Sequence, residues 1–304
     1  MKKISLFVLT MAMMLFLAAC SLESGTTNSN SSKKDDDSLV IGLSVSTLNN
    51  PFFVTLTDGA KAKAEELGAT LTVVDAQDNA SKQASDVEDL IQQKVDLILI
   101  NPVDSAAVAT AVESVNAAGI PVITIDRSSE GGEVVSHIAS DNVAGGVLAG
   151  EYLLELIGEG AKVAELEGVA GSSAARDRGE GFNTAVDGKL DIVAKQTANF
   201  NRAEGLTVME NILQANPDIV GVFAHNDEMA LGALEAIAAS GKDIKVIGFD
   251  ATDDAVAAVS AGTLSATVAQ KPDEIGVKAI EAAVKYLKGE TLEASIPVDL
   301  ELIK

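Results

Sequence analysis

The sequence predicts an α/β protein in which parallel sheets carry helices on both faces. From Leu39 to the C-terminus, short runs of Val, Ile and Leu alternate with longer stretches of helical period rich in Ala, Glu and Lys. This alternation is typical of strands joined by crossover helices. The apolar runs are continuous, so we expect strands that are buried on both faces. The 266 residues from Leu39 onward are enough for two lobes of ordinary domain size.

Strands and helices are expected in alternation along this part of the chain. The strands are expected at residues 39–45, 70–75, 96–100, 121–125, 162–166, 191–196, 219–224, 244–249 and 265–269. The helices are expected at residues 53–67, 80–93, 105–118, 142–157, 176–186, 202–215, 227–240, 252–261 and 273–288.

The N-terminal segment differs in composition from the rest of the chain. Lys2 and Lys3 precede an apolar stretch over residues 4–17, which predicts a secretory signal peptide over residues 1–19. That stretch is shorter than the roughly 20 residues a membrane-spanning helix needs. The residues before Cys20 resemble the lipobox of bacterial lipoproteins, which implies a lipidated Cys20; an export signal with an unrelated cysteine is the alternative. Residues 20–38 are rich in Ser and Asn and predict a flexible spacer.

Composition argues against several classes of function. A net charge of −23 would repel nucleic acid, so we expect no nucleic-acid partner. The only histidines, His137 and His225, lack the spacing of metal ligands. The Gly-rich segment 168–171 lacks the Lys of a phosphate-binding loop. With no activated nucleophile recognisable, we predict a protein that is not an enzyme and has no catalytic residues, metal or cofactor.

Polar side chains follow many of the predicted strands. They are Asn101, Asp126, Arg127, His225, Asn226, Asp250 and Gln270. The turn after the first strand adds Asn50, Phe52 and Phe53, which combine an amide with two aromatic rings in a chain poor in aromatic residues. Ligands of open parallel sheets bind at the carboxyl ends of the strands, and a ring face beside hydrogen-bonding groups suits a sugar. Helix capping is the alternative role for each Asn and Asp.

Seven longer motifs, in order along the chain, resemble those of the ribose-binding proteins of bacterial ABC importers. They are STLNNPFF, INPVDS, IPVITIDR, GEVVSHIASDN, GSSAARDRGEGF, FAHNDEMALGAL and ATVAQKPDEIG. The resemblance runs from about residue 39 to the C-terminus. It implies two doubly wound parallel-sheet lobes joined by a three-crossover hinge, the type I fold of periplasmic binding proteins. The crossovers would lie near residues 140–141, 270–271 and 299–300, giving an N-terminal lobe of 39–140 plus 271–299 and a C-terminal lobe of 141–270 plus 300–304.

The resemblance also implies which residues contact the sugar. These are Asn50, Phe52, Phe53, Asn101, Asp126, Arg127, Arg178, Phe200, Asn226, Asp250 and Gln270. The Phe rings would stack on the C–H faces of the sugar, the Arg forks would span neighbouring hydroxyls, and the carboxylates and amides would pair with the rest. His225 departs from the amide or small residue expected beside Asn226, and we expect its side chain at the rim, pointing away from the sugar.

The implied function is capture of D-ribose for an ABC importer by an exported monomer that is lipid-anchored to the outer face of the membrane through Cys20. The importer's membrane subunits would be its partners, and a chemoreceptor is a further partner in some relatives. Allose or another monosaccharide is the main alternative ligand, and a sugar-sensing role without transport is another. A sugar-responsive repressor shares this fold, but it would need a DNA-reading segment where this chain has the export signal and spacer.

Overall fold

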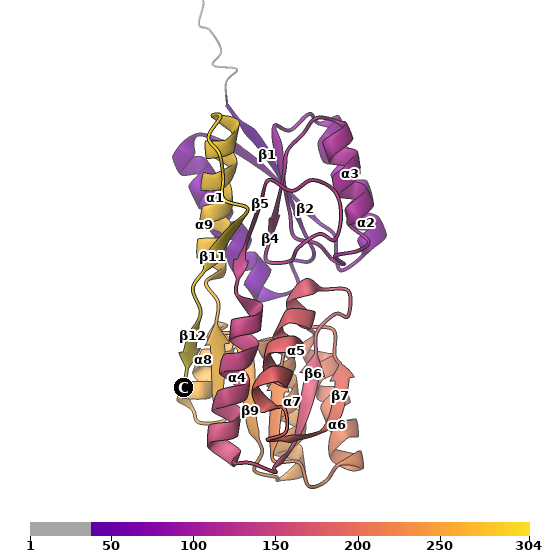
Figure 1. Cartoon of the computed structure of the whole chain (residues 1–304), viewed down its shortest axis with the longest axis vertical. Helices are drawn as coiled ribbons and strands as arrows, with labels where there is room; N and C mark the ends of the chain where they lie inside the picture. Colours follow the sequence, from indigo (N-terminus) through magenta and orange to yellow (C-terminus); the bar gives the residue numbers. More distant parts are fainter. Residues whose placement is uncertain (1–37) are drawn as a thin grey trace, which may run out of the picture. The chain divides into compact units, whose positions relative to one another are not determined.

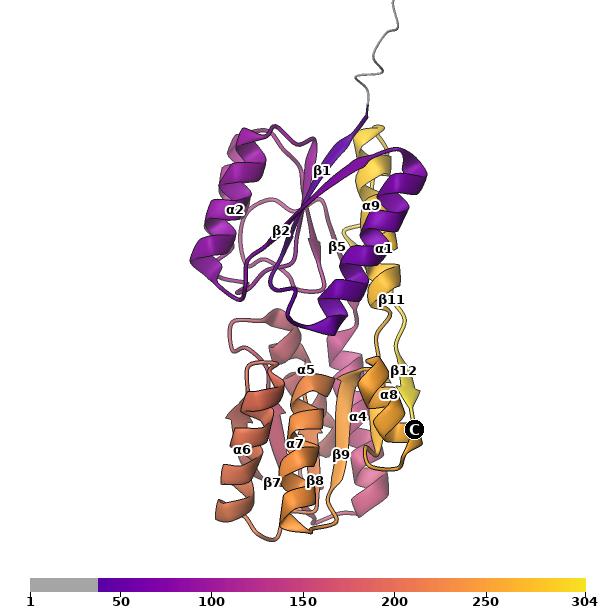
Figure 2. The ribbon, with the colours of Figure 1, turned by 180° about the vertical axis from the view of Figure 1, so that it is seen from behind.

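The computed structural model describes residues 38–304. These residues form two six-stranded sheets, each with helices on both faces (Figures 1 and 2). The predictions for the signal peptide, for Cys20 and for all of the spacer but its last residue lie outside the described residues. Within residues 38–304, no helix combines the length and the apolar character needed to cross a membrane.

The first sheet contains five strands from the first half of the described chain and one from near its end. In spatial order it consists of β11 (Ser295–Val298), β5 (Ser136–Ser140), β4 (Val122–Ile125), β3 (Leu97–Ile100), β1 (Val40–Val45) and β2 (Thr70–Asp75). All neighbouring strands are parallel. Their carboxyl ends therefore meet at one edge of the sheet.

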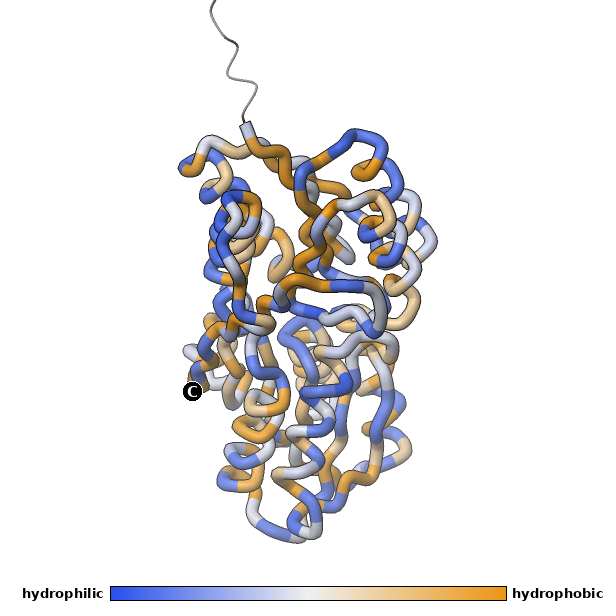
Figure 3. Tube along the Cα trace, turned by 45° about the horizontal axis from the view of Figure 1, so that its top comes forward, coloured by the Kyte–Doolittle hydropathy of each residue, from blue (hydrophilic) through white to orange (hydrophobic). Residues whose placement is uncertain are grey.

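Helices cover both faces of this sheet because successive strand residues point to opposite sides. Leu97 and Leu99 of β3 pack with α1 (Pro51–Leu67) and α9 (Pro272–Leu287), whereas Ile98 and Ile100 pack with α2 (Ala80–Gln92) and α3 (Ala109–Ala117). The two apolar layers explain why β3 is apolar at every position. Figure 3 shows hydrophilic and hydrophobic residues alternating along the turns of the helices.

The second sheet repeats this arrangement with one antiparallel edge. In spatial order it consists of β12 (Glu301–Ile303), β10 (Ala266–Ala269), β9 (Lys245–Asp250), β8 (Gly221–Ala224), β6 (Lys162–Glu167) and β7 (Asp191–Thr197), with β12 antiparallel to β10. On one face, α4 (Asn142–Ile157) and α5 (Ser173–Val186) pack over Phe249. On the other, α6 (Arg202–Ala215), α7 (Asp227–Ser240) and α8 (Asp253–Ser260) pack over Val246.

The chain passes between the two sheets three times. It leaves the first sheet after β5 and enters α4, which packs on β9. It returns after β10 to α9, which packs on α1, and crosses again between β11 and β12. Both sheets therefore depend on segments that are far apart in the sequence.

Three strands were not predicted, and two predicted strands are less buried than expected. The unpredicted strands are β5, which contains His137 and two Ser, β11, which contains Pro297, and the three-residue β12. Burial on both faces was wrong for β2 and β7, because each lies at an edge of its sheet and has no neighbour on one side. Helix α3 begins four residues later than predicted, after a turn in which Asp104 Oδ1 accepts from the N–H groups of Ala106 and Ala107.

Candidate ligand-binding site

One cavity lies between the carboxyl ends of the two sheets. Its empty space, part of which is open to solvent, amounts to about 250 Å³. Its lining residues are Asn50, Phe52, Phe53, Asp126, Arg127, Ala174, Arg178, Phe200, Asn226, Asp250 and Gln270. Ten of these were singled out from the sequence. Asn101 was also singled out but does not line the cavity, whereas Ala174 lines it without having been predicted.

The turn after β1 places an aromatic corner in the cavity wall. Asn50 caps α1, since its Oδ1 accepts from the N–H of Phe52 at 2.9 Å. Pro51 starts the helix with its fixed φ, and the two following rings meet edge to face with centroids 5.1 Å apart. Asn50 therefore caps the helix and also lines the cavity. The amide nitrogen of its side chain makes no hydrogen bond within residues 38–304 and is available to a ligand.

Asp126 and Arg127 extend this wall from the end of β4. Asp126 Oδ2 accepts a 3.1 Å hydrogen bond from Asn101 Nδ2. Asn101 also donates to the carbonyl of Ile125 and accepts from the N–H of Ser46, so it ties Asp126 to the strand ends on either side. Its position is that of a support beneath the cavity. Burial lowers the pKa of Arg127, and the negative charge of the neighbouring Asp126 opposes this shift.

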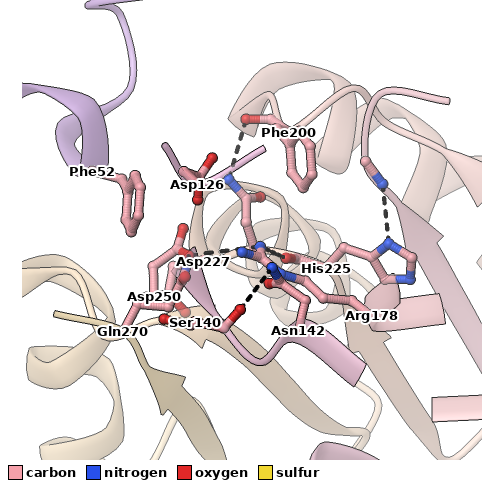
Figure 4. A network of polar contacts seen from close by, with 12 residues as sticks. Phe52, Asp126, Ser140, Asn142, Arg178, Phe200, His225, Asp227, Asp250 and Gln270 are labelled. Carbon is pink, nitrogen blue, oxygen red and sulfur yellow. Dashed lines mark hydrogen bonds and ion pairs between the residues drawn. The ribbon is translucent and has the colours of Figure 1, made fainter. Parts of the chain in front are cut away.

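The opposite wall is built around Arg178. Its Nε donates to Asn142 Oδ1 at 2.8 Å and its Nη1 donates to the carbonyl of His225 at 2.6 Å. The guanidinium lies 3.9 Å from the ring centroid of Phe249 and 3.7 Å from Asp250 Oδ1. These contacts fix the plane of the guanidinium before any ligand binds. Figure 4 shows Arg178, Asp250 and Phe200 around the same space.

Asp250 and Gln270 complete this wall from the ends of β9 and β10. Gln270 Nε2 donates to Asp250 Oδ1 at 2.8 Å. Burial raises the pKa of Asp250 well above its usual value, whereas the charge of Arg178 opposes the shift. Asn226 caps α7 by accepting from the N–H of Met229 at 3.0 Å and donates weakly to the carbonyl of Phe200.

Arg127 links the aromatic groups of both walls. Its guanidinium carbon lies 5.2 Å from the ring centroid of Phe53 and 5.3 Å from that of Phe200. The cavity therefore presents aromatic rings together with two guanidinium groups and two carboxyl groups. The charged groups and the rings of Phe52 and Phe53 are nearly excluded from solvent, whereas Phe200 is partly exposed. Such a wall matches a small neutral ligand that has apolar faces and many hydroxyls.

Two polar atoms of the cavity residues have no hydrogen-bond partner, although one of them, Arg127 Nε, lies 3.6 Å from Asp126 Oδ2. Arg127 Nε and Gln270 Oε1 are buried and make no hydrogen bond within the described residues. Leaving a buried polar atom unpaired costs about 1 to 3 kcal/mol. A donor and an acceptor left over in one cavity are therefore ready to pair with a ligand that can both donate and accept.

His225 is neither at an exposed rim nor in the cavity lining. Its side chain is 1% exposed and points away from the cavity toward Glu165, as Figure 4 shows for the ring. The side chain points in the expected direction, but it is buried behind the cavity and does not lie at the rim. Burial lowers the pKa of His225, so the ring is neutral at pH 7. Within residues 38–304, no cluster of three or more His, Cys, Asp or Glu side chains could hold a metal ion.

Two residues of the site, Ala174 and Asn142, were not predicted from the sequence. Ala174 offers only a methyl group, and nothing in its residue type marks it as part of a cavity. Asn142 acts through Arg178, and its role depends on how α4 and α5 pack. It does lie in the motif GEVVSHIASDN, so its position in that motif was the available signal.

Comparisons with known proteins agree on the class of this chain. The profile of the periplasmic binding protein domain family matches residues 41–291. The chain is 56% identical over 302 residues to the ribose import binding protein RbsB of Bacillus subtilis, covering 99% of each chain.

Solved structures of ABC transporter solute binding proteins are also similar. One from Mycobacterium smegmatis, with bound glycerol, has a TM-score of 0.85 and 39% identity over 88% of this chain and 94% of its own. Another from Actinobacillus succinogenes, with bound D-allose, has a TM-score of 0.82 and 32% identity over 88% of this chain and 97% of its own. These findings confirm the predicted fold class of two doubly wound α/β lobes. The chain belongs to the periplasmic binding protein family.

Proposed function

We propose that this chain is an extracytoplasmic substrate-binding protein that captures D-ribose between its two lobes and delivers it to an ABC importer. The observation that carries this proposal is the cavity wall, in which aromatic rings lie beside buried polar atoms of Arg127 and Gln270 that make no hydrogen bond. The 56% identity to a protein named for ribose import supports the choice of sugar. The role is binding and delivery, without catalysis, metal or cofactor.

Each wall has a role in this proposal. The rings of Phe52, Phe53 and Phe200 would pack on the C–H faces of the sugar, and Arg127 and Arg178 would donate to neighbouring hydroxyls. Asp126 and Asp250 would accept from hydroxyls, while Asn50, Asn226 and Gln270 would donate or accept. Asn101, which we expected to touch the sugar, would act through Asp126.

The two lobes would be the moving parts. We assign 39–140 plus 271–299 to one and 141–270 plus 300–304 to the other, with the three chain passages between the sheets as the hinge. Because ligand groups come from both lobes, full contact requires the lobes to approach each other. An importer subunit that reads the distance between lobes would then distinguish loaded from empty protein.

The exported location rests on the N-terminal sequence. We propose removal of a signal peptide over 1–19, lipidation of Cys20 and a spacer over 20–38 that leads to a monomeric binding unit outside the cell membrane. Partners would be the membrane subunits of the importer and, where the organism has one, a chemoreceptor. Radiolabelled fatty acid should enter the expressed chain and should not enter Cys20→Ala.

Calorimetric titration of the purified chain with D-ribose and D-allose tests the ligand assignment. We expect D-ribose to bind in the micromolar range or tighter, because the cavity offers pairing groups on all sides. A single unmatched hydroxyl would cost about tenfold or more in affinity. D-Allose is the second candidate, since a structural relative holds it. Tight binding of allose with no heat from ribose would refute the ribose assignment and leave the sugar-binding role intact.

A further inference from the structure

A buried histidine and a buried glutamate, joined by a hydrogen bond, lie directly behind the ligand cavity. His225 Nε2 and Glu165 Oε1 are 2.9 Å apart, and the side chains are 1% and 0% exposed. Neither residue lines the cavity. Burying a carboxylate is expensive, so its presence here needs an explanation that the ligand contacts do not supply.

The hydrogen bonds around His225 fix its tautomer. The N–H of Gly168 points at Nδ1 at 3.4 Å, so Nδ1 accepts and the proton lies on Nε2, which donates to Glu165. The depressed pKa of His225 agrees with a neutral ring. A protonated ring would place a second N–H at Nδ1, facing the N–H of Gly168.

The helix that carries Arg178, α5, packs directly against this pair. A Cβ at Gly179 would lie 3.2 Å from Glu165 Oε1 and 3.3 Å from His225 Cε1, so this turn of α5 rests directly on the pair. One turn later, Asn183 Nδ2 donates to both carboxylate oxygens of Glu165. The carbonyl of His225 itself accepts from Arg178 Nη1.

The same pair reaches the aromatic wall through Gly168. A Cβ at Gly168 would lie 2.1 Å from Phe200 Cζ, so the ring of Phe200 rests against this backbone. Thr197 Oγ1 donates to the carbonyl of Gly168 at 2.8 Å and His225 holds its N–H. Hydrogen bonds from residues outside the cavity lining thus fix both the N–H and the carbonyl of Gly168.

We propose that Glu165 and His225 are positioning residues for the binding site. Neutral His225, hydrogen-bonded to Glu165, fixes the position of the α5 turn that carries Arg178 and of the Gly168 backbone against which Phe200 packs. The inference rests on the proposed function, because it assigns the pair a role in sugar affinity. The charged groups around His225 are Glu165 and Glu167 from β6, Lys195 from β7, whose Nζ lies 3.3 Å from Glu165 Oε2, and Arg178 from α5.

Two substitutions at position 225 test the role with the purified full chain. His225→Gln keeps one donor for Glu165 and one acceptor for Gly168, so we expect D-ribose affinity within about threefold of wild type, a change smaller than the loss of one hydrogen bond. His225→Ala leaves Glu165 and Gly168 without their partner, and we expect a loss of about tenfold or more. Both affinities are measured by calorimetry, well below the melting temperature of each variant.

His137→Ala is the matched control, because His137 is the other histidine and its Nδ1 also makes one hydrogen bond, to Thr124 Oγ1 at 2.9 Å, away from the cavity lining. It should lower stability and leave affinity nearly unchanged. Equal losses of affinity in His225→Gln and His225→Ala, or an equal loss in the control, would overturn the positioning role.

Nitrogen NMR of the His225 ring provides a readout that does not depend on the sugar. We expect the neutral tautomer with the proton on Nε2 at pH 7. A proton on Nδ1, or a charged ring, would overturn the pair as described. A wild-type chain that binds neither ribose nor allose would refute the proposed function instead, while the tautomer would still decide whether the pair exists.

Discussion

At the scale of single residues, three cavity residues have an unusual backbone. Asp126, Phe200 and Asp250 have φ values of 61°, 59° and 121°, a region that residues with a side chain rarely occupy. Each such residue costs about 1 to 3 kcal/mol and persists only where its surroundings hold it. At Asp250, the next residues are held by Asp227, which accepts from the N–H of Thr252 at 2.8 Å. All three of these residues line the ligand cavity.

Arg178→Lys should reduce D-ribose affinity by about tenfold or more, because an ammonium cannot reproduce the planar fork that donates to Asn142 and to the carbonyl of His225 and that would also donate to the proposed sugar. Calorimetry measures the change. Arg202→Lys is the control, since Arg202 is partly exposed and pairs with Glu228 and Asp254 outside this cavity. An unchanged affinity in Arg178→Lys would show that the guanidinium does not contact the ligand.

Burial raises the pKa of Asp227 to about 7. The unfolded chain ionises this group near pH 3.8, so the contribution of Asp227 to stability is largest below pH 3.8 and falls as the pH rises toward 7. The unfolding free energy of wild type minus that of Asp227→Asn should therefore decrease between pH 4 and pH 7 and then level off. Urea melts of the ligand-free protein measure it, and a difference that stays constant over this range would contradict the raised pKa.

At the scale of elements, glycines let helices approach each other closely. A Cβ at Gly146 of α4 would lie 2.2 Å from the carbonyl oxygen of Arg178, and one at Gly181 of α5 would lie 2.0 Å from the carbonyl oxygen of Val143. The pairs α6 with α7 and α1 with α9 show the same reciprocal arrangement at Gly205 and Gly232 and at Gly59 and Gly276. The α4–α5 contact places Asn142 and Arg178 within hydrogen-bonding distance.

Gly181→Ala should therefore act on the site from outside it. The added methyl group would separate α4 from α5, so we expect a stability loss of about 1 to 3 kcal/mol from overpacking and weaker D-ribose binding through Arg178. Thermal melts and calorimetry measure the two effects. Thr184→Ala, at an exposed position on the same helix, should change neither. A destabilised Gly181→Ala protein that binds ribose normally would show that the two helices do not set the position of Arg178.

The sequence allowed prediction of the elements whose pattern is local. Continuous apolar runs predicted β3 and β8 because both faces of these strands are buried. β5 and β11 were missed, since His137 and Pro297 break the apolar pattern and only pairing with neighbouring strands makes these segments extended. In the site, the strand-end position marked Asp126 and Asp250. It could not separate them from Asn101, whose side chain turns beneath the cavity because of contacts with Ser46 and Ile125.

At the scale of the whole described chain, the lobes also touch each other away from the cavity lining. The N–H of Ser105 donates to the carbonyl of Gly171 at 2.9 Å, and Ser173 both donates to Ser105 Oγ and accepts from the N–H of Ser128. Arg176 and Glu130 add an ion pair at 2.6 Å. These contacts join the two lobes without using any sugar-facing atom.

Ser173→Ala should weaken D-ribose binding about three- to tenfold, because loss of one hydrogen bond between lobes lowers the fraction of protein in the binding-competent arrangement. Calorimetry measures it, and Ser85→Ala on the exposed surface of α2 is the control. Normal affinity in Ser173→Ala would mean that the sugar contacts alone bring the lobes together.

Small-angle scattering tests the motion itself. The radius of gyration should be smaller with saturating D-ribose than without it, since the ligand stabilises the arrangement in which both lobes contact it. Ser173→Ala without sugar should be at least as extended as wild type without sugar. Equal radii with and without ribose would contradict a hinge.

The passage from β11 to β12 has a consequence for how the chain acquires its fold during synthesis. Each sheet takes one edge strand from residues 295–303, and the first sheet also takes α9 from residues 272–287. A ribosome therefore has to synthesise all of the residues before 295 before either lobe has all of its parts. We propose that this chain crosses a membrane through a narrow translocation channel. Because neither lobe can finish folding early, the polypeptide would stay unfolded enough to pass through the channel until it has reached the far side.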